Sequence, residues 1–360
     1  MKIAALQTVS APEVEVNLAS ADRLLAEAAA AGAGLAALPE YFCLMGRRDA
    51  DKLDIAEAPG DGPIQHFLAD AALRHRLWIV GGTLPVKTDD PAKVLNRSTL
   101  WSPDGRLVAH YDKIHLFRFG QGEERYDEAR VLRAGAEPMA AQAGALRVGL
   151  SVCYDLRFPE LYRALMQPPC DLLCVPSAFT VPTGRAHWEL LLRARAVENQ
   201  CYVLAPAQGG LHPNGRRTWG HSMIVDPWGE VLALRPEGEG VVVAELDLDR
   251  LAEVRVRLPA LEHRRLWRWR PRRRRTSALG QERSRTTSCL GATQADQTGR
   301  DAGFSTRLDG RRGFTAARQR STSRVARLQH PKRPVPRSPR TPPGPNALEA
   351  TRPRASAGEG

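Results

Sequence analysis

Three residues that could act as an acid–base group, a fixed positive charge and a nucleophile each follow an apolar segment. Glu40 lies in LPEYF, Lys113 in YDKIHLF and Cys153 in GLSVCYD. Strand ends are where a rigid sheet presents side chains to a cleft, so residues far apart in sequence can meet there. By itself, a glutamate such as Glu40 indicates a surface carboxylate, and a lysine such as Lys113 indicates a solvated charge. A single cysteine such as Cys153 indicates either a small buried hydrophobe or a reactive thiol. Their joint occurrence favours thiol-based hydrolysis.

The three types suit one reaction, the hydrolysis of an amide. A thiol with a pKa of about 8.5 is mostly protonated at neutral pH, so Glu40 would accept its proton. Lys113 would hold the thiolate and stabilise the oxyanion, with the backbone N–H of Tyr154 as a second donor. Cys153 would carry a thioester that water then hydrolyses. This chemistry needs neither a metal nor an organic cofactor.

Positioning these groups requires a layered fold. Helix-like segments alternate with strand-like ones, which favours an α/β architecture. The PDG turn at 103–105 and the DPWG turn at 226–229 indicate antiparallel pairing as well, so we expect two sheets packed face to face with helices outside. Predicted helices cover 16–34, 63–76, 158–167 and 184–200. Predicted strands cover 2–9, 35–42, 77–86, two within 96–116, 145–155, 170–179, 201–210, 220–234 and 240–248.

The charge is unevenly distributed along the chain. The 360 residues carry a net charge of +12, which divides into −4 over residues 1–267 and +16 over 268–360. The second segment is rich in Arg, Ser, Thr and Pro, so it cannot bury enough apolar surface to order itself. We expect a domain over 1–267 and a disordered tail over 268–360. A reading frame that shifts near Trp267 is one explanation of the change.

Cysteine usage and hydropathy bear on location. The spacing of the six cysteines does not resemble a disulfide framework, and a chain of this size does not need one. Cys170 and Cys174 lack a nearby second pair, so zinc is not expected. No signal-peptide pattern opens the sequence, and no run of about 18 apolar residues suggests a membrane span. We therefore expect a cytoplasmic protein. The six cysteines are Cys43, Cys153, Cys170, Cys174, Cys201 and Cys289.

Five motifs in order over residues 1–267 resemble the nitrilase superfamily of carbon–nitrogen hydrolases, and most closely its branch of deaminated glutathione amidases. They are LPEYF, YDKIHLF, GLSVCYDLRFPELYR, RARAVENQCYVLAPAQGG and GHSMIVDPWGEVLA. The resemblance implies a four-layer α-β-β-α sandwich and a catalytic triad of Glu40, Lys113 and Cys153. It also implies a homodimer or higher homo-oligomer, for which the helices at 158–167 and 187–199 are candidate surfaces, although core packing explains their apolar faces equally well.

The resemblance also implies a second glutamate that supports the triad. In GEERYDEARVLRAG the best match is Glu128. The alternative is an exposed loop carboxylate, and Glu123 or Glu124 could be mistaken for the supporting residue.

Arg157 and Thr183 are the candidate substrate-binding residues, together with Tyr154. Arg157 follows Cys153 by four residues, and an arginine fork suits a substrate carboxylate. Thr183 matches a family position that helps bind that end. A structural ion pair of Arg157 with Asp155 or Glu160 is the alternative.

The sequence thus predicts an amidase that acts on a small carboxylate-bearing amide, such as deaminated glutathione or a related α-keto acid amide. An ω-amidase, an N-carbamoyl amino acid amidohydrolase and a nitrilase remain open, because motifs do not fix pocket contacts. A papain-like protease would need a histidine base, and we interpret His115, His187 and His221 as packing and hydrogen-bonding residues. Nucleic-acid binding through the tail is the alternative from another class, disfavoured because no binding fold accompanies the charge.

Overall fold

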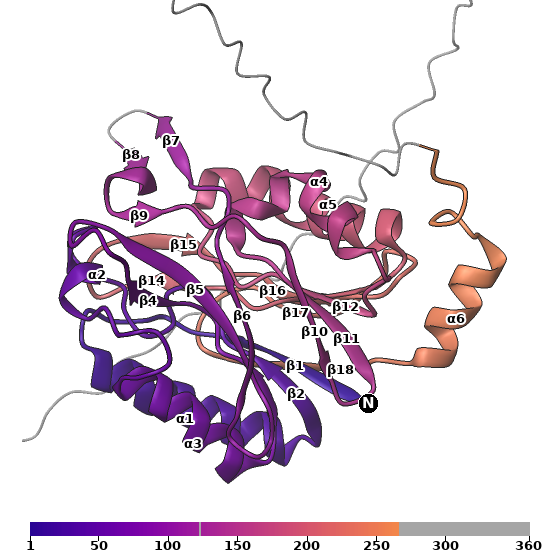
Figure 1. Cartoon of the computed structure of the whole chain (residues 1–360), viewed down its shortest axis with the longest axis horizontal. Helices are drawn as coiled ribbons and strands as arrows, with labels where there is room; N and C mark the ends of the chain where they lie inside the picture. The colour runs from indigo at the N-terminus through magenta and orange to yellow at the C-terminus, as the bar shows by residue number, and fades with distance from the viewer. Residues whose placement is uncertain (122–123, 266–360) are drawn as a thin grey trace, which may run out of the picture. The chain divides into compact units, whose positions relative to one another are not determined.

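The computed structural model describes residues 1–121 and 124–265, and these form two sheets with helices outside them (Figure 1). The expected tail over 268–360 lies outside the described residues. The predicted four-layer sandwich is confirmed, since sheet, sheet and flanking helices follow one another as the alternating sequence segments required.

The first sheet has eight strands in the order β18-β1-β2-β3-β5-β4, with β6 and β9 also paired to β5. β1, β2 and β3 run parallel, and β5 is antiparallel to β3, β4 and β6. Its strands are β1 (Lys2–Gln7), β2 (Ala33–Ala37), β3 (Trp78–Val80), β4 (Leu84–Lys87), β5 (Val94–Trp101), β6 (Leu107–Asp112), β9 (Leu132–Arg133) and β18 (Gly240–Glu245).

The second sheet has six strands in the order β10-β11-β12-β13-β16-β17, of which β11, β12 and β13 are parallel. Two separate hairpins lie beside the sheets. The strands of the sheet are β10 (Met139–Ala143), β11 (Leu146–Leu150), β12 (Leu172–Cys174), β13 (Tyr202–Ala205), β16 (Ser222–Val225) and β17 (Val231–Arg235). The hairpins are β7 (Arg118–Gln121) with β8 (Glu124–Asp127), and β14 (Gly209–Leu211) with β15 (Arg217–Trp219).

The helices cover the outer faces of the sheets. α1 and α3 pack on the first sheet, and α5 packs on β13 and β16 of the second. The predicted helices are all present, with ends shifted by a few residues. The helices are α1 (Val14–Ala30), α2 (Asp51–Asp54), α3 (Pro63–His75), α4 (Pro159–Leu165), α5 (Val181–Asn199) and α6 (Leu248–Arg257), with short 3₁₀ turns η1 (Glu128–Arg130) and η2 (Cys153–Arg157).

Side-chain alternation along β1 shows how one strand serves two cores. Ile3 and Ala5 join the cluster that includes the second sheet, whereas Ala4 and Leu6 join the cluster that includes α1 and α3. All four side chains are fully buried. Because successive strand residues point to opposite faces, a stretch buried on both faces is expected to be apolar throughout, as IAAL at residues 3–6 is.

Several elements differ from the sequence predictions: β7, β8, β9, β10, β15 and α2 were not predicted, and the strand expected over 220–234 is divided into β16 and β17. The strand expected over 77–86 breaks into β3 and β4 at Gly82, whose φ is +49° and where a Cβ atom would overlap the carbonyl oxygen of Pro39. The strand expected over 145–155 ends at Leu150, because the chain turns before Cys153. α6 was not predicted; the Asp247 carboxylate caps it by accepting bonds from two backbone N–H groups, a standard N-terminal signal.

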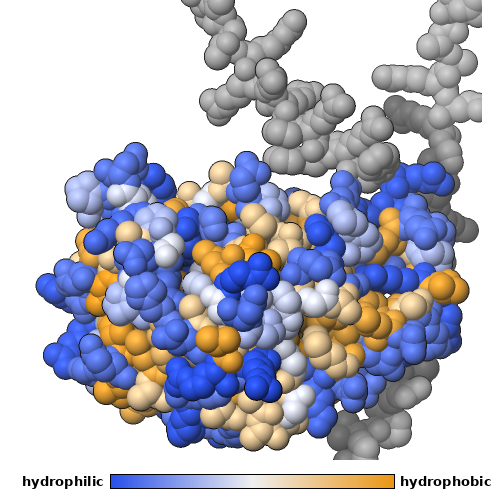
Figure 2. All heavy atoms as spheres, turned by 60° about the horizontal axis from the view of Figure 1, so that its bottom comes forward, coloured by the Kyte–Doolittle hydropathy of each residue, from blue (hydrophilic) through white to orange (hydrophobic). Residues whose placement is uncertain are grey.

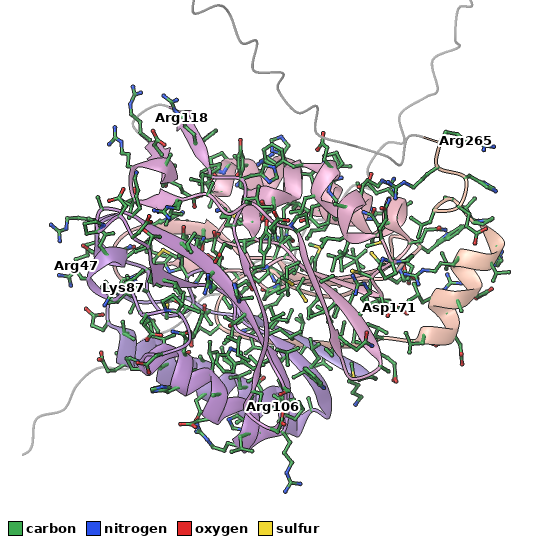
Figure 3. All side chains as sticks on the ribbon, viewed as in Figure 1. Arg47, Lys87, Arg106, Arg118, Asp171 and Arg265 are labelled. Atoms are coloured by element: carbon green, nitrogen blue, oxygen red, sulfur yellow. The ribbon has the colours of Figure 1, made fainter. Side chains whose placement is uncertain are left out.

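The exterior is mixed in character. Figure 2 turns the side of α1 and α3 forward and shows polar side chains interspersed with apolar ones. Among the charged residues labelled in Figure 3, Arg106 and Arg118 extend outward from the ribbon, while side chains fill the space between the layers. In the described part of the chain, no helix has the length and apolarity needed to cross a bilayer.

Candidate active site

Glu40 lies three residues beyond the end of β2, in a loop held from both sides. Leu38 N–H donates to the carbonyl of Val80 at 2.9 Å, and Tyr41 N–H donates to the Thr83 hydroxyl at 2.9 Å. The Gln208 amide donates to the Glu40 carbonyl at 3.1 Å. The Glu40 side chain is only 1% exposed, so its carboxylate is directed into the protein rather than to the solvent.

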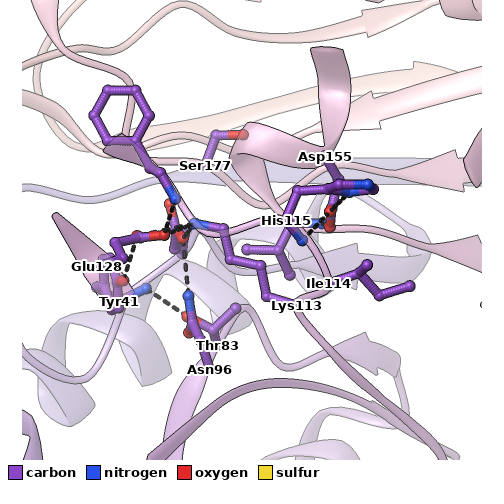
Figure 4. A network of polar contacts seen from close by, with 12 residues as sticks. Tyr41, Thr83, Asn96, Lys113, Ile114, His115, Glu128, Asp155 and Ser177 are labelled. Carbon is purple, nitrogen blue, oxygen red and sulfur yellow. Dashed lines mark hydrogen bonds and ion pairs between the residues drawn. The ribbon is translucent and has the colours of Figure 1, made fainter. Parts of the chain in front are cut away.

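Lys113 bridges two carboxylates at the centre of the site (Figure 4). Its Nζ lies 2.9 Å from Glu40 Oε1 and 2.8 Å from Glu128 Oε2, and the side chain is fully buried. Lys113 follows β6, and its backbone N–H donates to the Asn96 carbonyl at 3.0 Å. The Asn96 amide donates to the same Glu40 oxygen, at 2.9 Å. Glu40 Oε1 is therefore occupied by two donors, which leaves Oε2 for a further partner.

Glu128 is fixed by three donors from two segments of the chain. Besides Lys113, it accepts a hydrogen bond from the Tyr41 hydroxyl at 2.9 Å and another from the Phe117 N–H at 2.7 Å. The structure therefore places Glu128 in one cluster with Lys113 and Glu40. Glu124 lies on β8, and Glu123 lies outside the described residues.

Cys153 stands at a sharp turn after β11, the first residue of η2. Its φ of +48° is unusual for a residue with a side chain, and such backbone strain persists only where the surroundings hold it. The Cys153 N–H donates to the Pro176 carbonyl at 2.9 Å, which ties the turn to the segment after β12. The thiol contacts the Glu40 carboxylate and the Ala178 N–H. Tyr154 is the second residue of η2, so its N–H lacks a partner within the turn.

Asp155 joins the cysteine turn to the lysine segment, a role that the sequence analysis did not assign. This fully buried carboxylate accepts hydrogen bonds from the Val152 N–H and the Tyr111 hydroxyl, both at 2.8 Å. It also accepts from the backbone N–H of His115 and bonds the imidazole Nδ1 at 2.7 Å. Tyr111 and His115 flank Lys113, so one carboxylate sets the spacing between the amine and the thiol.

Burial and neighbouring charges determine the protonation states. Burial raises the pKa of the Cys153 thiol well above its usual value; Glu40 raises it further, and Lys113 acts in the opposite direction. For Lys113, burial lowers the pKa, but the adjacent Glu128 and Glu40 carboxylates outweigh it, so the net shift is upward. The resting site therefore holds a neutral thiol beside a protonated lysine at neutral pH.

A hollow of about 330 Å³ gives access to the cluster. Besides Glu40, Glu128 and Cys153, it is lined by the predicted binding residues Tyr154, Arg157 and Thr183. The structure thus brings all seven predicted site residues together, with Lys113 at the back of the cluster.

The alternative ion pair for Arg157 is not formed within the described residues. Asp155 is taken by Tyr111 and His115, whereas Arg157 contacts the His187 imidazole at 3.2 Å and lies over the rings of Tyr154 and Phe179. The guanidinium therefore faces the hollow without a carboxylate partner from the described part of the chain.

Several residues of the site were missed by sequence reasoning. Asn96 lies inside β5, where only the three-dimensional approach of β5 to the Glu40 loop reveals its role. Gln208 is buried, and it hydrogen-bonds the Ser10 backbone and hydroxyl as well as the Glu40 carbonyl. Arg216 reaches the hollow from the β14–β15 turn. No local pattern marks these residues, because their partners are distant in sequence.

Comparison with known proteins identifies the family. The model of the carbon–nitrogen hydrolase family matches residues 2–256. The chain belongs to this family. It is therefore a hydrolase of carbon–nitrogen bonds, and the predicted resemblance to the nitrilase superfamily is confirmed.

The relatives of this carbon–nitrogen hydrolase include a deaminated glutathione amidase from Synechocystis, 43% identical over 265 residues, which cover 72% of this chain and 97% of that protein. A structure of Saccharomyces cerevisiae Nit3, a nitrilase-superfamily member, has a TM-score of 0.67 and 30% identity, with 74% and 96% of the two chains covered. An amidase from Nesterenkonia sp. AN1, captured with acrylamide added to its active-site cysteine, has a TM-score of 0.60 and 27% identity over 72% and 98%.

Proposed function

We propose that this hydrolase is a cysteine-dependent amidase that cleaves a small carboxylate-bearing amide, deaminated glutathione or a related α-keto acid amide. The observation that carries the proposal is the Lys113 bridge between Glu40 and Glu128, directly beside the Cys153 thiol in a hollow. The name of the Synechocystis relative supports the same substrate.

In the first half of the reaction, Cys153 Sγ attacks the amide carbonyl and its proton passes to Glu40. Lys113 and the Tyr154 N–H stabilise the oxyanion; the loss of one such donor costs about 3 kcal/mol of barrier. Glu40 then gives the proton to the leaving nitrogen as the C–N bond breaks, which leaves a thioester on Cys153 and releases ammonia or an amine.

In the second half, Glu40 takes a proton from water as the water oxygen attacks the thioester. The C–S bond breaks, the proton returns to the sulfur, and the carboxylic acid leaves. Glu128 contacts Lys113 rather than the reacting atoms, and so we assign it as a positioning residue that keeps the amine directed at the site. The Arg157 fork and the Thr183 hydroxyl would bind the substrate carboxylate.

A product-release screen tests the proposal. Wild type should release amine or ammonia from deaminated glutathione, and the substitutions Cys153→Ala, Glu40→Gln and Lys113→Ala should each reduce turnover by at least about a thousandfold. The same screen separates the remaining alternatives, since an ω-amidase prefers 2-oxoglutaramate, an N-carbamoyl amidohydrolase ureido acids and a nitrilase nitriles. Full activity in Cys153→Ala would exclude the mechanism.

We also propose that two copies pair through α4 and α5. Leu190 and Val197 on α5 are 68% and 47% exposed, and their spacing of seven residues places them on one face. Light scattering should report a dimer for wild type and a monomer for Leu190→Glu, with Leu73→Glu on α3 as the control that remains dimeric. A wild-type monomer at micromolar concentration would exclude the pairing.

Two further proposals concern the boundary of the hydrolase domain near residue 267 and the cellular location of the protein. If the hydrolase domain ends near residue 267, deletion of 268–360 will leave amidase activity intact, and any nucleic-acid binding will be lost. The intact mass of the native protein tests whether the tail is a true product. We propose a cytoplasmic location, supported by the five described cysteines, all of which are free thiols; cell fractionation tests it.

A further inference from the structure

A second hollow adjoins the one that contains Cys153. It has a volume of about 380 Å³, and it shares four lining residues with the first: Tyr41, Phe117, Glu128 and Arg216. These four side chains therefore lie where the two hollows meet. A substrate with a substituted nitrogen is longer than a primary amide, so its leaving group would extend from the first hollow toward the second.

Arg216 stands where the two hollows meet, and its position is fixed by the β14–β15 hairpin. The backbone N–H of Arg216 donates to the Asn214 side-chain oxygen at 2.9 Å. The Asn214 side-chain amide in turn donates to the Met45 and Gly46 carbonyls. The Arg216 guanidinium lies 5.1 Å from the centre of the Tyr126 ring. The side chain is thus held by the hairpin anchor and this ring.

The Arg216 guanidinium lacks an anionic partner in the described part of the chain. Its Nε is buried and has no hydrogen-bond partner there, and one Nη contacts only the Met45 sulfur, at 3.7 Å. A buried donor left unbonded is costly unless a ligand completes it. An unpaired guanidinium at the edge of a substrate hollow is suited to a carboxylate, which it can bind through two parallel hydrogen bonds.

The other charges of the second hollow are already matched within it or at its edge. Glu128 is held by Lys113 at 2.8 Å, Asp49 by Lys52 at 3.2 Å, and Asp127 lies 4.0 Å from Arg118. Each of these carboxylates thus has a cation beside it, although Lys113 is shared with Glu40 at 2.9 Å. Arg216 differs from Lys52, the other cation that lines this hollow, because no carboxylate among the described residues forms an ion pair with it.

The direction of the reaction indicates which part of the substrate meets Arg216. The leaving nitrogen must face Glu40, because Glu40 supplies its proton. Tyr41 follows Glu40 in the chain, its hydroxyl bonds Glu128 at 2.9 Å, and both line the shared wall beside Arg216. Arg157 lies instead with Tyr154 and the Phe179 ring. The acyl part thus extends toward Arg157, and the leaving amine extends toward Arg216.

We propose that Arg216 is a specificity residue that binds a carboxylate on the leaving amine, so that the preferred substrate is a secondary amide with an anionic group on each side of the scissile bond. Such a substrate is an α-keto acid joined to a short peptide with a free C-terminus. The inference rests on the proposed amidase function and adds to it a subsite for the departing group.

A pair of substrates that differ in one group tests the inference. Deaminated glutathione carries a free carboxylate on its leaving dipeptide, and its C-terminal amide carries none. For wild type, kcat/KM should be about tenfold to a hundredfold higher for the free acid, as expected for hydrogen bonds to a charged group. Arg216→Gln should abolish this preference, and Arg216→Lys should retain part of it.

The neighbouring Arg217 provides the matched control, because it is exposed and paired with Glu237 at 2.8 Å; Arg217→Gln should keep the wild-type preference. Equal kcat/KM values for the two substrates in wild type, or an undiminished preference in Arg216→Gln, would overturn the inference while leaving the amidase proposal in place. Failure of wild type to hydrolyse either substrate would overturn the amidase proposal itself, and the subsite with it. The comparison in wild type decides the matter even if Arg216→Gln does not fold.

Discussion

Replacement of Lys113 by methionine tests whether the buried amine holds the site together. In the wild type, its Nζ lies within 2.9 Å of carboxylate oxygens of both Glu40 and Glu128. Lys113→Met keeps the chain length but removes the positive charge. The Glu40 and Glu128 carboxylates would then face each other without a cation between them. In the wild type, Lys113 is fully buried and Glu40 is 1% exposed, so water would screen the repulsion poorly.

The expected loss in unfolding free energy follows from this geometry. Removing one partner of a buried ion pair costs about 3–5 kcal/mol, because the other charge remains uncompensated. We expect the lower part of this range, since Asn96 still donates to Glu40, and both Tyr41 and Phe117 still donate to Glu128. Adding Glu128→Gln removes one of the two repelling charges, so the double variant should recover about 1–2 kcal/mol.

The pH dependence gives a second, signed readout of the same change. Like charge raises the pKa of the carboxyl groups in folded Lys113→Met. Groups with a raised folded pKa stabilise the protein at low pH and lose that contribution as the pH rises. The stability deficit of Lys113→Met relative to wild type should therefore be smaller at pH 5 than at pH 8.

Urea unfolding of wild type, both single variants and the double variant, at each pH, provides the required cycle. A loss below about 1 kcal/mol in Lys113→Met, or a double variant no more stable than Lys113→Met, would refute the reasoning, given the usual cost of an unpaired buried charge.

Three further results are expected. Asn96→Leu removes a hydrogen bond to the Glu40 carboxylate, so kcat/KM should fall by about tenfold or more; an unchanged kcat/KM would contradict this role. Because burial raises the pKa of Cys153, its alkylation by iodoacetamide should be slow at pH 7 and still be accelerating above pH 9, whereas a rate plateau near pH 7 would indicate a resting thiolate. Gly82→Ala should lower the unfolding free energy by about 2 kcal/mol or more, because the new Cβ atom overlaps a backbone carbonyl. Gly60→Ala, which has open space around the new Cβ atom, should lower the unfolding free energy by about half as much. Equal melting temperatures for the two variants would contradict this prediction.

The strand and helix pattern was predictable because it depends on local periodicity. Continuous apolar runs such as IAAL at residues 3–6 mark strands buried on both faces, and the alternation of strands with helices indicates the layers. The break at Gly82 was not predictable from the sequence, because the need for a residue without a Cβ atom arises from the approach of the Glu40 loop. The turn at Cys153 was likewise placed on a strand, although its φ is positive.

The residues of the candidate site fall into two groups, those marked by a sequence motif and those marked only by their contacts in the fold. Glu40, Lys113 and Cys153 stand in distinctive motifs, so their types and their neighbours along the chain are enough to propose them as the catalytic residues. Asn96, on the other hand, acts through contacts made across the fold. A residue of this class is recognisable only when its distant partners are placed beside it.

The most direct measurement is the mass of the peptide that contains Cys153 after rapid acid quenching of wild type during turnover of excess deaminated glutathione. The account predicts that the peptide gains the mass of the keto-acyl group, and that the gain is absent in Cys153→Ser. An unmodified Cys153 peptide at every time point, with the substrate still consumed, would contradict a thioester mechanism.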